Sequence, residues 1–178
     1  IPAERLTDAQ KKAIQEFEAA RKTGLSGPFW PLLRSPEVMS RARAMGDYLR
    51  YKSAIGTTLS ELVILITARE MDSQFEWSAH EPEALKEGVP QATVDAIKHR
   101  GSTAGLDDTD AMVIELARQS WGDHKVTSEL FAKLKTRFGP NMLIDIVLLM
   151  GIYAGTAALL HAVDMQLHAG TKPPLPMP

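Results

Sequence analysis

Glu76 and His80 stand four residues apart, which places them on one helical face if their segment is a helix. A carboxylate beside an imidazole can hold its tautomer, raise its pKa or share a proton with a substrate. Ser73 lies about one turn before Glu76 and would extend the same polar stripe. Glu61 would reach that stripe if its own helix packs antiparallel to this one. The segment 61–80 is therefore the candidate site, and its chemistry would be acid–base catalysis.

Simpler interpretations of the same residues stand beside this one. A Glu–His pair at this spacing is common on solvated helix faces, where it contributes only a few tenths of a kcal/mol. Thr58-x-x-Glu61 has the pattern of a capping box, which by itself accounts for a glutamate at position 61. A second pair, His161 and Asp164, has similar spacing in the last predicted helix. Spacing alone leaves the functional and the structural interpretations open.

Several chemistries lack the residues they need. The chain has no cysteine, which excludes disulfides, thiolate catalysis and cysteine-ligated metal sites. It has no second Glu-x-x-x-His and no His-x-x-x-His, so Glu76 and His80 would lack partners for a metal ion. It also has no glycine-rich phosphate loop and no Gly-x-Ser-x-Gly elbow. We therefore expect neither a metal nor a cofactor.

Composition narrows the class of partner. Hydrophobic residues make up 44% of the 178, enough for a substantial core. The net charge of −2, the absence of a basic run and the aromatic content of 6% argue against a nucleic-acid partner. Ile1–Gln10 is polar and has no signal-peptide pattern, and together with the missing cysteines this favours a cytoplasmic location. The uncharged run 146–160 falls short of the roughly 20 residues of a membrane span, so we expect no membrane insertion.

The elements that must position these residues are helices nearly throughout. Thr7-x-x-Gln10 forms a capping-box pattern before the first helix, and Asp72 and Ser73 indicate a break before the helix of Glu76. No run of alternating residues predicts a strand. After the first helix, the predicted helices are 36–53, 58–69, 73–87, 91–99, 107–119, 128–138 and 141–168.

The remaining segments suggest one domain, 1–178, that forms oligomers. Its N-terminal part, 1–35, would contain the first helix and an apolar loop, Phe29–Leu33, too apolar to be left in solvent. The last helix carries small residues, among them Gly151 and Gly155, which would let another helix approach closely. The proline-rich tail, 171–178, is expected to be an extended strap.

The stretch 61–88 resembles the core motif of the carboxymuconolactone decarboxylase and alkylhydroperoxidase D-like superfamily. In the redox branch of that superfamily, a glutamate is followed about twelve residues later by Cys-x-x-Cys and then, four residues on, by histidine. Glu61, Ser73, Glu76 and His80 keep this spacing. Flanking strings and the downstream helices 109–167 resemble a subgroup without cysteines. The resemblance implies an all-α, AhpD-like helical bundle that oligomerises through apolar helices as a dimer, trimer or hexamer.

The resemblance also implies roles for the motif positions. Ser73 and Glu76 replace the two cysteines, so thiol peroxidase chemistry is excluded even where a peroxidase-type label is inherited from the family. The decarboxylase branch instead implies a lyase acting on a small carboxylated substrate, with His80 as the acid–base residue. Glu76 would be its partner or the proton donor, and Glu61 would support it.

Other residues would complete the substrate pocket of this lyase. Ser73 would donate a hydrogen bond to the substrate, and Arg69 would pair with its carboxylate. Three aromatic side chains would line the wall: Trp30, Phe75 and Trp77. The alternative hypothesis is a helical oligomer without catalysis, which binds a small molecule or serves as a structural partner.

Overall fold

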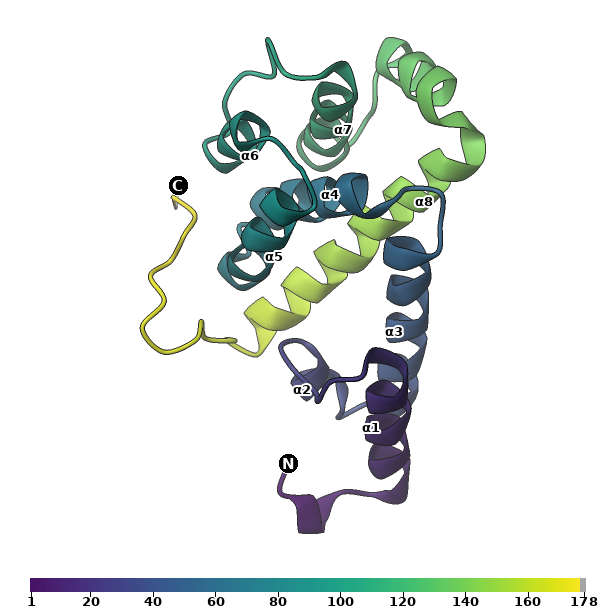
Figure 1. Ribbon diagram of the computed structural model, residues 1–178, viewed down its shortest axis with the longest axis vertical. Coiled ribbons are helices and arrows are strands. Elements are labelled where there is room, and N and C mark those ends of the chain that lie inside the picture. Colours follow the sequence, from purple (N-terminus) through teal and green to yellow (C-terminus); the bar gives the residue numbers. More distant parts are fainter. Residues whose placement is uncertain (177–178) are drawn as a thin grey trace. The chain divides into compact units, whose positions relative to one another are not determined.

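The protein is all-α, as predicted, in a computed structural model that describes residues 1–176 (Figure 1). Within these residues there is no strand. The helices are η1 (Ala3–Arg5), α1 (Asp8–Arg21), α2 (Phe29–Leu32), α3 (Pro36–Tyr51), α4 (Thr57–Glu70), α5 (Gln74–Lys86), α6 (Gln91–Lys98), α7 (Asp108–Arg118), the π-helical turn η2 (Gln119–Asp123) and α8 (Ser128–Ala162).

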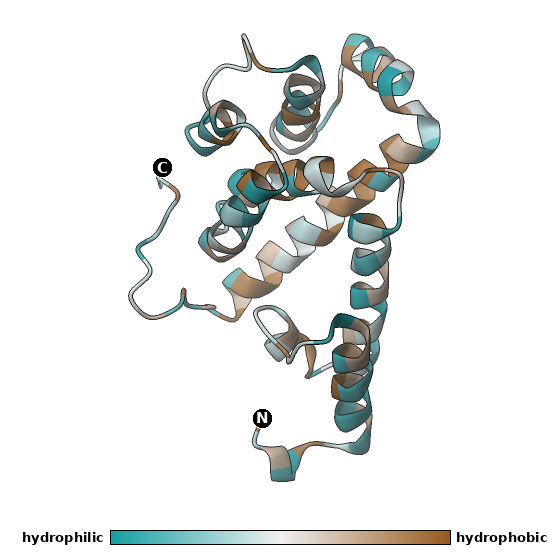
Figure 2. Cartoon of the chain, in the orientation of Figure 1, coloured by the Kyte–Doolittle hydropathy of each residue, from teal (hydrophilic) through white to brown (hydrophobic). Residues whose placement is uncertain are grey.

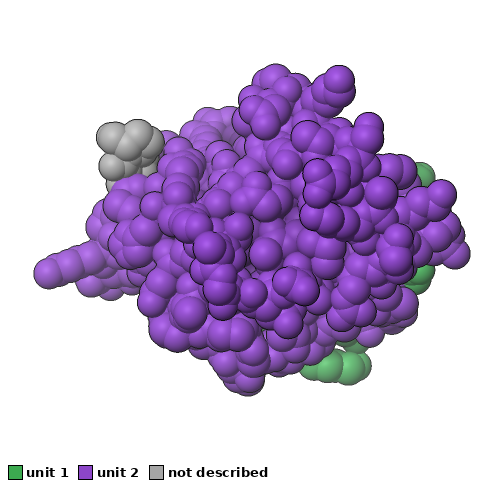
Figure 3. Space-filling view, turned by 90° about the horizontal axis from the view of Figure 1, so that it is seen from above, with its two compact units in different colours: residues 1–48 green, residues 49–178 purple. Residues whose placement is uncertain are grey.

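The chain divides into two compact units, residues 1–48 and 49–178 (Figure 3). The boundary between the units falls inside α3, so that Leu49, Arg50 and Tyr51 belong to the second unit. The single domain 1–178, with an N-terminal part ending at residue 35, stays a prediction.

The first unit has its own small core. Phe17 of α1 is fully buried, and its ring lies 4.6 Å from that of Phe29. The predicted capping box at Thr7 and Gln10 is present. The segment 29–33, expected to be an apolar loop, contains the single helical turn α2, and Leu33 at its end is buried. Trp30 in this turn is half-exposed.

Helix α4 forms the centre of the second unit. Every residue from Ser60 to Arg69 is buried, because α5, α6, α7 and α8 all pack against this helix. In Figure 2, brown apolar residues alternate with paler ones along this helix. Most of these residues are aliphatic, as expected for a helix surrounded by others. Glu61 and Arg69 are the exceptions, and each must find a partner inside the protein.

The predicted capping box at the start of α4 does not form. The N-cap is Gly56, whose φ of 78° suits glycine, and it makes no side-chain cap. Thr58 instead donates its hydroxyl hydrogen to the carbonyl of Glu87, at 2.6 Å. The carboxylate of Glu61 instead contacts Arg50 and His80.

Helix α8 bends where the sequence predicted a break. Gly139 has a φ of 70° and a ψ of 169°, and Pro140 follows as the first residue of the second arm. The second arm ends at Ala162 rather than at the predicted His168. The chain turns there, with Asp164 in the left-handed conformation.

By length and composition alone, α8 could cross a membrane, a test that core helices of soluble proteins also pass. In its most apolar window, 39% of the residues are buried inside the protein. Its buried face includes Ile146, Leu149 and Tyr153, whereas Ile144, Val147 and Leu148 are exposed. The helix is thus a core element that also presents an apolar face.

The C-terminal segment returns to the start of α5. The side-chain amide of Gln74 donates to the carbonyl of Leu175 and accepts from its backbone N–H, both at 2.9 Å. Leu175 itself is buried. The extended strap predicted for 171–178 is therefore anchored at this point; residues 177 and 178 lie outside the described part of the chain.

Candidate active site

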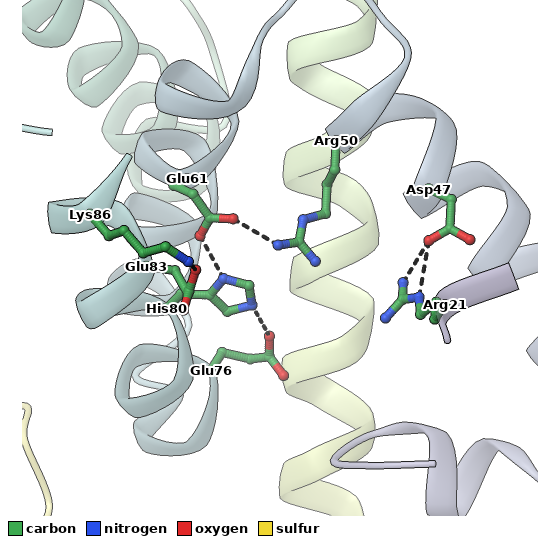
Figure 4. A network of polar contacts seen from close by, with 8 residues as sticks. All are labelled: Arg21, Asp47, Arg50, Glu61, Glu76, His80, Glu83 and Lys86. Carbon is green, nitrogen blue, oxygen red and sulfur yellow. Dashed lines mark hydrogen bonds and ion pairs between the residues drawn. The ribbon is translucent and has the colours of Figure 1, made fainter. Parts of the chain in front are cut away.

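Helices α4 and α5 bring Glu61, Glu76 and His80 together (Figure 4). The Nδ1 atom of His80 lies 2.7 Å from one carboxylate oxygen of Glu61. On the other side of the ring, Nε2 lies 3.6 Å from a carboxylate oxygen of Glu76. The imidazole thus stands between two carboxyl groups, one from each helix, in the cluster that the spacing predicted.

The cluster is buried. The side chains of Glu61 and Glu76 are 5% and 4% exposed, and that of His80 is 12% exposed. A solvated Glu–His pair on a helix face is therefore excluded. Electrostatic interactions between these groups are stronger than they would be at the surface, because little water screens them.

Arg50 supplies the positive charge of the site. Its Nη2 donates to the second carboxylate oxygen of Glu61 at 2.7 Å, and its side chain is 14% exposed. Its Nε is buried and has no hydrogen-bond partner among the described residues. Sequence reasoning missed Arg50, because nothing in its local pattern distinguishes it from the other arginines of α3.

The two glutamates of the cluster have pKa values shifted in opposite directions. Burial favours the neutral form of Glu61, but the hydrogen bond with His80 and the charges of His80 and Arg50 outweigh it and lower the pKa of this carboxyl group. For Glu76, burial dominates over the nearby charges and raises the pKa. One carboxyl group is thus biased towards the ionised form and the other towards the protonated form, the pattern that separates acid from base in enzymes.

Tyr153 of α8 completes the wall beside the imidazole. Its ring meets that of His80 edge-on, at 5.2 Å between centroids and an interplanar angle of 85°. Burial raises the pKa of its hydroxyl group far above the ordinary value, so the phenol stays protonated. It too was missed, because residue 153 is distant in sequence and its apolar neighbours only predict a core position.

Ser73 serves as the N-cap of α5. Its side chain accepts a hydrogen bond from the backbone N–H of Glu76 at 3.5 Å, and it is buried. This contact fixes the helix start, and with it the position of Glu76. The substrate contact predicted for Ser73 stays a prediction.

Arg69 does not join the cluster. It forms an ion pair with Asp72, and Arg100 donates to Asp72 and to the carbonyl of Arg69. The guanidinium of Arg69 is thus paired at the C-terminal end of α4, two turns from Glu61. Of the two guanidinium groups, Arg50 is the one beside the imidazole.

The three predicted wall residues lie in different surroundings. Trp77 is fully buried in the core, and Lys98 lies 5.9 Å from the centre of its ring. Phe75 is half-buried, with its ring 6.0 Å from that of His168. Trp30 belongs to the first unit. Their roles towards a substrate stay predictions.

No group of three or more histidine, aspartate or glutamate side chains with a geometry suited to a metal ion occurs among residues 1–176. The cluster of Glu61, Glu76 and His80 is arranged as a chain of pairs through the imidazole. Such a chain can take up, hold and release a proton.

The fold and the site define a class of protein. It is helical and has no thiol, and its buried imidazole lies between two carboxyl groups whose pKa values are shifted in opposite directions. The family model of the carboxymuconolactone decarboxylase family matches residues 36–117. The resemblance predicted from the sequence is confirmed over these residues. The match contains Arg50, Glu61, Glu76 and His80, whereas Tyr153 lies beyond it. No curated protein matches the chain.

Proposed function

We propose that this protein is a non-redox lyase that decarboxylates, or performs a related acid–base step on, a small carboxylated substrate. One observation carries the proposal: His80 is held between Glu61, whose lowered pKa favours the carboxylate, and Glu76, whose raised pKa favours the acid. The match of residues 36–117 to the decarboxylase family model supports the same class of reaction.

The proton step follows from this arrangement. Loss of carbon dioxide breaks a carbon–carbon bond and leaves its electron pair delocalised over the substrate's carbonyl group. That anion then takes up a proton at carbon. Glu76 in its acid form donates this proton, and the imidazole of His80, oriented through Nδ1 by Glu61, returns one from solvent to Glu76. In balance, a carboxylate and one proton give carbon dioxide and the protonated product.

Arg50 replaces Arg69 as the proposed partner of the substrate's carboxylate. Its guanidinium uses one nitrogen for Glu61 and keeps a buried Nε without a partner among the described residues. Guanidinium groups with free donors bind carboxylates strongly, particularly where water is scarce.

The direct test is an assay of carboxylated lactones, which follows the release of carbon dioxide. His80→Ala and Glu76→Gln should abolish turnover while the melting temperature and the oligomeric state persist. Glu83→Gln is the matched control, because Glu83 is an exposed glutamate on the same helix, paired only with Lys86. Failure of the unmodified protein to turn over any member of the panel would count against the lyase.

The exclusion of thiol chemistry has a separate test. The chain has no cysteine to be oxidised by a hydroperoxide. Turnover of an alkyl hydroperoxide by metal-free protein would contradict the assignment to the non-redox branch.

The alternative, a helical oligomer that binds a small molecule without catalysis, is favoured by the exposed apolar face of α8. Ile144, Val147 and Leu148 are 43–59% exposed, and Gly151 and Gly155 continue the same face. We propose that a second copy of the chain covers this face. Val147→Glu should then reduce the molar mass in light scattering. Saturable binding of a carboxylated lactone without turnover would favour the non-catalytic alternative.

A further inference from the structure

A cavity lies in the second unit, outside the candidate active site. It has a volume of about 380 Å³ and is bounded by the beginning of α4, the beginning of α7 and the bend of α8. None of Arg50, Glu61, Glu76, His80 and Tyr153 lines it. Its volume falls within the range of cavities that bind small molecules.

The floor of this cavity is apolar and preformed. It is lined by Ile55, Leu62, Val89, Phe138 and Met142. The first three are buried members of the main core, and the last two pack against it. Because the core holds these side chains in place, a ligand's apolar body would contact them without first ordering a loop.

Arg137 is the cation of this cavity. Its Nε donates to the hydroxyl oxygen of Thr109 at 3.1 Å, and its guanidinium carbon lies 5.8 Å from the centre of the Phe138 ring. The charge of Arg137 acts on the carboxylate of Asp107, but within residues 1–176 no carboxylate lies close enough to form an ion pair with it. The two contacts hold the guanidinium at the cavity wall, while its terminal nitrogens stay available as donors.

The one carboxylate of the lining limits the charge that the cavity accepts. Asp110 accepts a hydrogen bond from the hydroxyl of Thr93 at 2.7 Å. Its negative charge opposes a doubly charged anion such as a phosphate monoester. A ligand with one negative charge can bind the guanidinium at a smaller repulsive cost.

We propose that this cavity binds a small monocarboxylate with an apolar body, at a site separate from the catalytic cluster. The carboxylate would accept hydrogen bonds from Arg137, and the body would lie over Leu62, Val89 and Met142. This inference does not depend on the lyase reaction, because the two sites share no side chain.

Titration of the unmodified full chain with octanoate and with benzoate tests the proposal, read out by calorimetry and by amide chemical shifts. The matched neutral probes are octanol and benzyl alcohol. We expect saturable binding of a carboxylate, with the largest shifts at Thr57, Val89 and Met142. Arg137→Met should weaken binding about tenfold or more, since a charge-assisted hydrogen bond is lost.

Lys135→Gln is the charge-matched control, because Lys135 is an exposed cation on the same arm of α8 and does not line the cavity. Both variants should keep the helical spectrum and melting temperature. No saturable binding to the unmodified protein would overturn the proposal. So would equal binding of the alcohols, equal loss in both variants, or shifts centred on His80.

Discussion

Helix α4 has an arginine–carboxylate cluster near each end, and the two clusters are built differently. In the first half, Arg50 pairs with Glu61, which also contacts His80. At the C-terminal end, Arg69 pairs with Asp72, which also contacts Arg100. Both remove most of an arginine side chain from solvent, and in both a carboxylate pairs with it.

The difference lies in the third partner. In the C-terminal cluster this partner is a second guanidinium, which stays charged at all ordinary pH values; it fastens α4 to the end of α6 through the carbonyl of Arg69. In the first cluster it is an imidazole, followed by a second carboxyl group with a raised pKa. A buried ion pair alone therefore does not indicate a functional site, whereas one connected to an imidazole and a second carboxyl group makes a candidate.

The largest effect is expected when the kcat of His80→Ala is compared with that of Asp72→Asn. Losing His80, the proposed acid–base residue, should lower kcat by roughly 10²–10⁴-fold. Asp72→Asn should reduce stability and leave kcat per folded molecule near the unmodified value. Both are measured in the lactone assay, well below the melting temperatures. An equal loss of kcat in the two variants would erase the distinction between the clusters.

Next in size is Arg50→Met, which leaves the Glu61 carboxylate buried beside the imidazole without its guanidinium. We expect a loss of about 3–5 kcal/mol in the free energy of unfolding at pH 7, measured by urea denaturation. The folded-state pKa of Glu61 is lowered, so its stabilising contribution exists above the unfolded pKa and disappears as the pH falls through the folded value. The gap between variant and unmodified protein should therefore narrow in acid.

A matched double variant sharpens this test. Adding Glu61→Gln to Arg50→Met removes the unpaired charge and should recover part of the lost stability. If the double variant is as unstable as the sum of the single ones, the two side chains are not coupled.

Glu76→Gln should change the pH dependence of stability more than its value at low pH. The pKa of Glu76 is raised in the folded state, so its contribution is fully present below the unfolded pKa and is lost as the pH rises through the folded value. The unmodified protein should lose up to about 1.4 kcal/mol per pH unit across that window. The Gln variant should lack this slope, and Asp72→Asn should retain it.

The smallest effect is expected from Ser73→Ala. Removing the N-cap should cost about 0.5–1 kcal/mol, at the low end because the contact is long. The value of kcat/KM should change less than twofold if Ser73 acts only as a cap. A much larger loss of kcat/KM at unchanged stability would restore the substrate contact that the sequence suggested.

Local patterns predicted the helices well, because periodicity and breaks are properties of neighbouring residues. The turn at Asp72 and Ser73 and the bend at Gly139 lie where expected. The pattern at Thr58 and Glu61 failed, because a capping box and a buried carboxylate have the same sequence signature. Only tertiary packing decides between them. Here the carboxylate of Glu61 binds the guanidinium of Arg50 and the imidazole of His80.

The candidate site was predictable where spacing within two adjacent helices sufficed. Glu61, Glu76 and His80 met that condition. Arg50 and Tyr153 approach from α3 and α8, and no local signal connects them to residue 80. Arg69 was predicted to bind the substrate's carboxylate because it is a cation in the helix of Glu61. In the structure it pairs with Asp72, in the turn that follows.

The amide pairing between Gln74 and Leu175 bears on the order in which the molecule assembles. It joins positions 101 residues apart, so the chain must close a long loop before these bonds can form. Contacts between distant residues form late in folding, and we expect the helices around α4 to dock first. The C-terminal segment would then be the last part to attach and the first to open, without unfolding the core. The imidazole cluster would then form before the segment around Leu175 attaches to the start of α5.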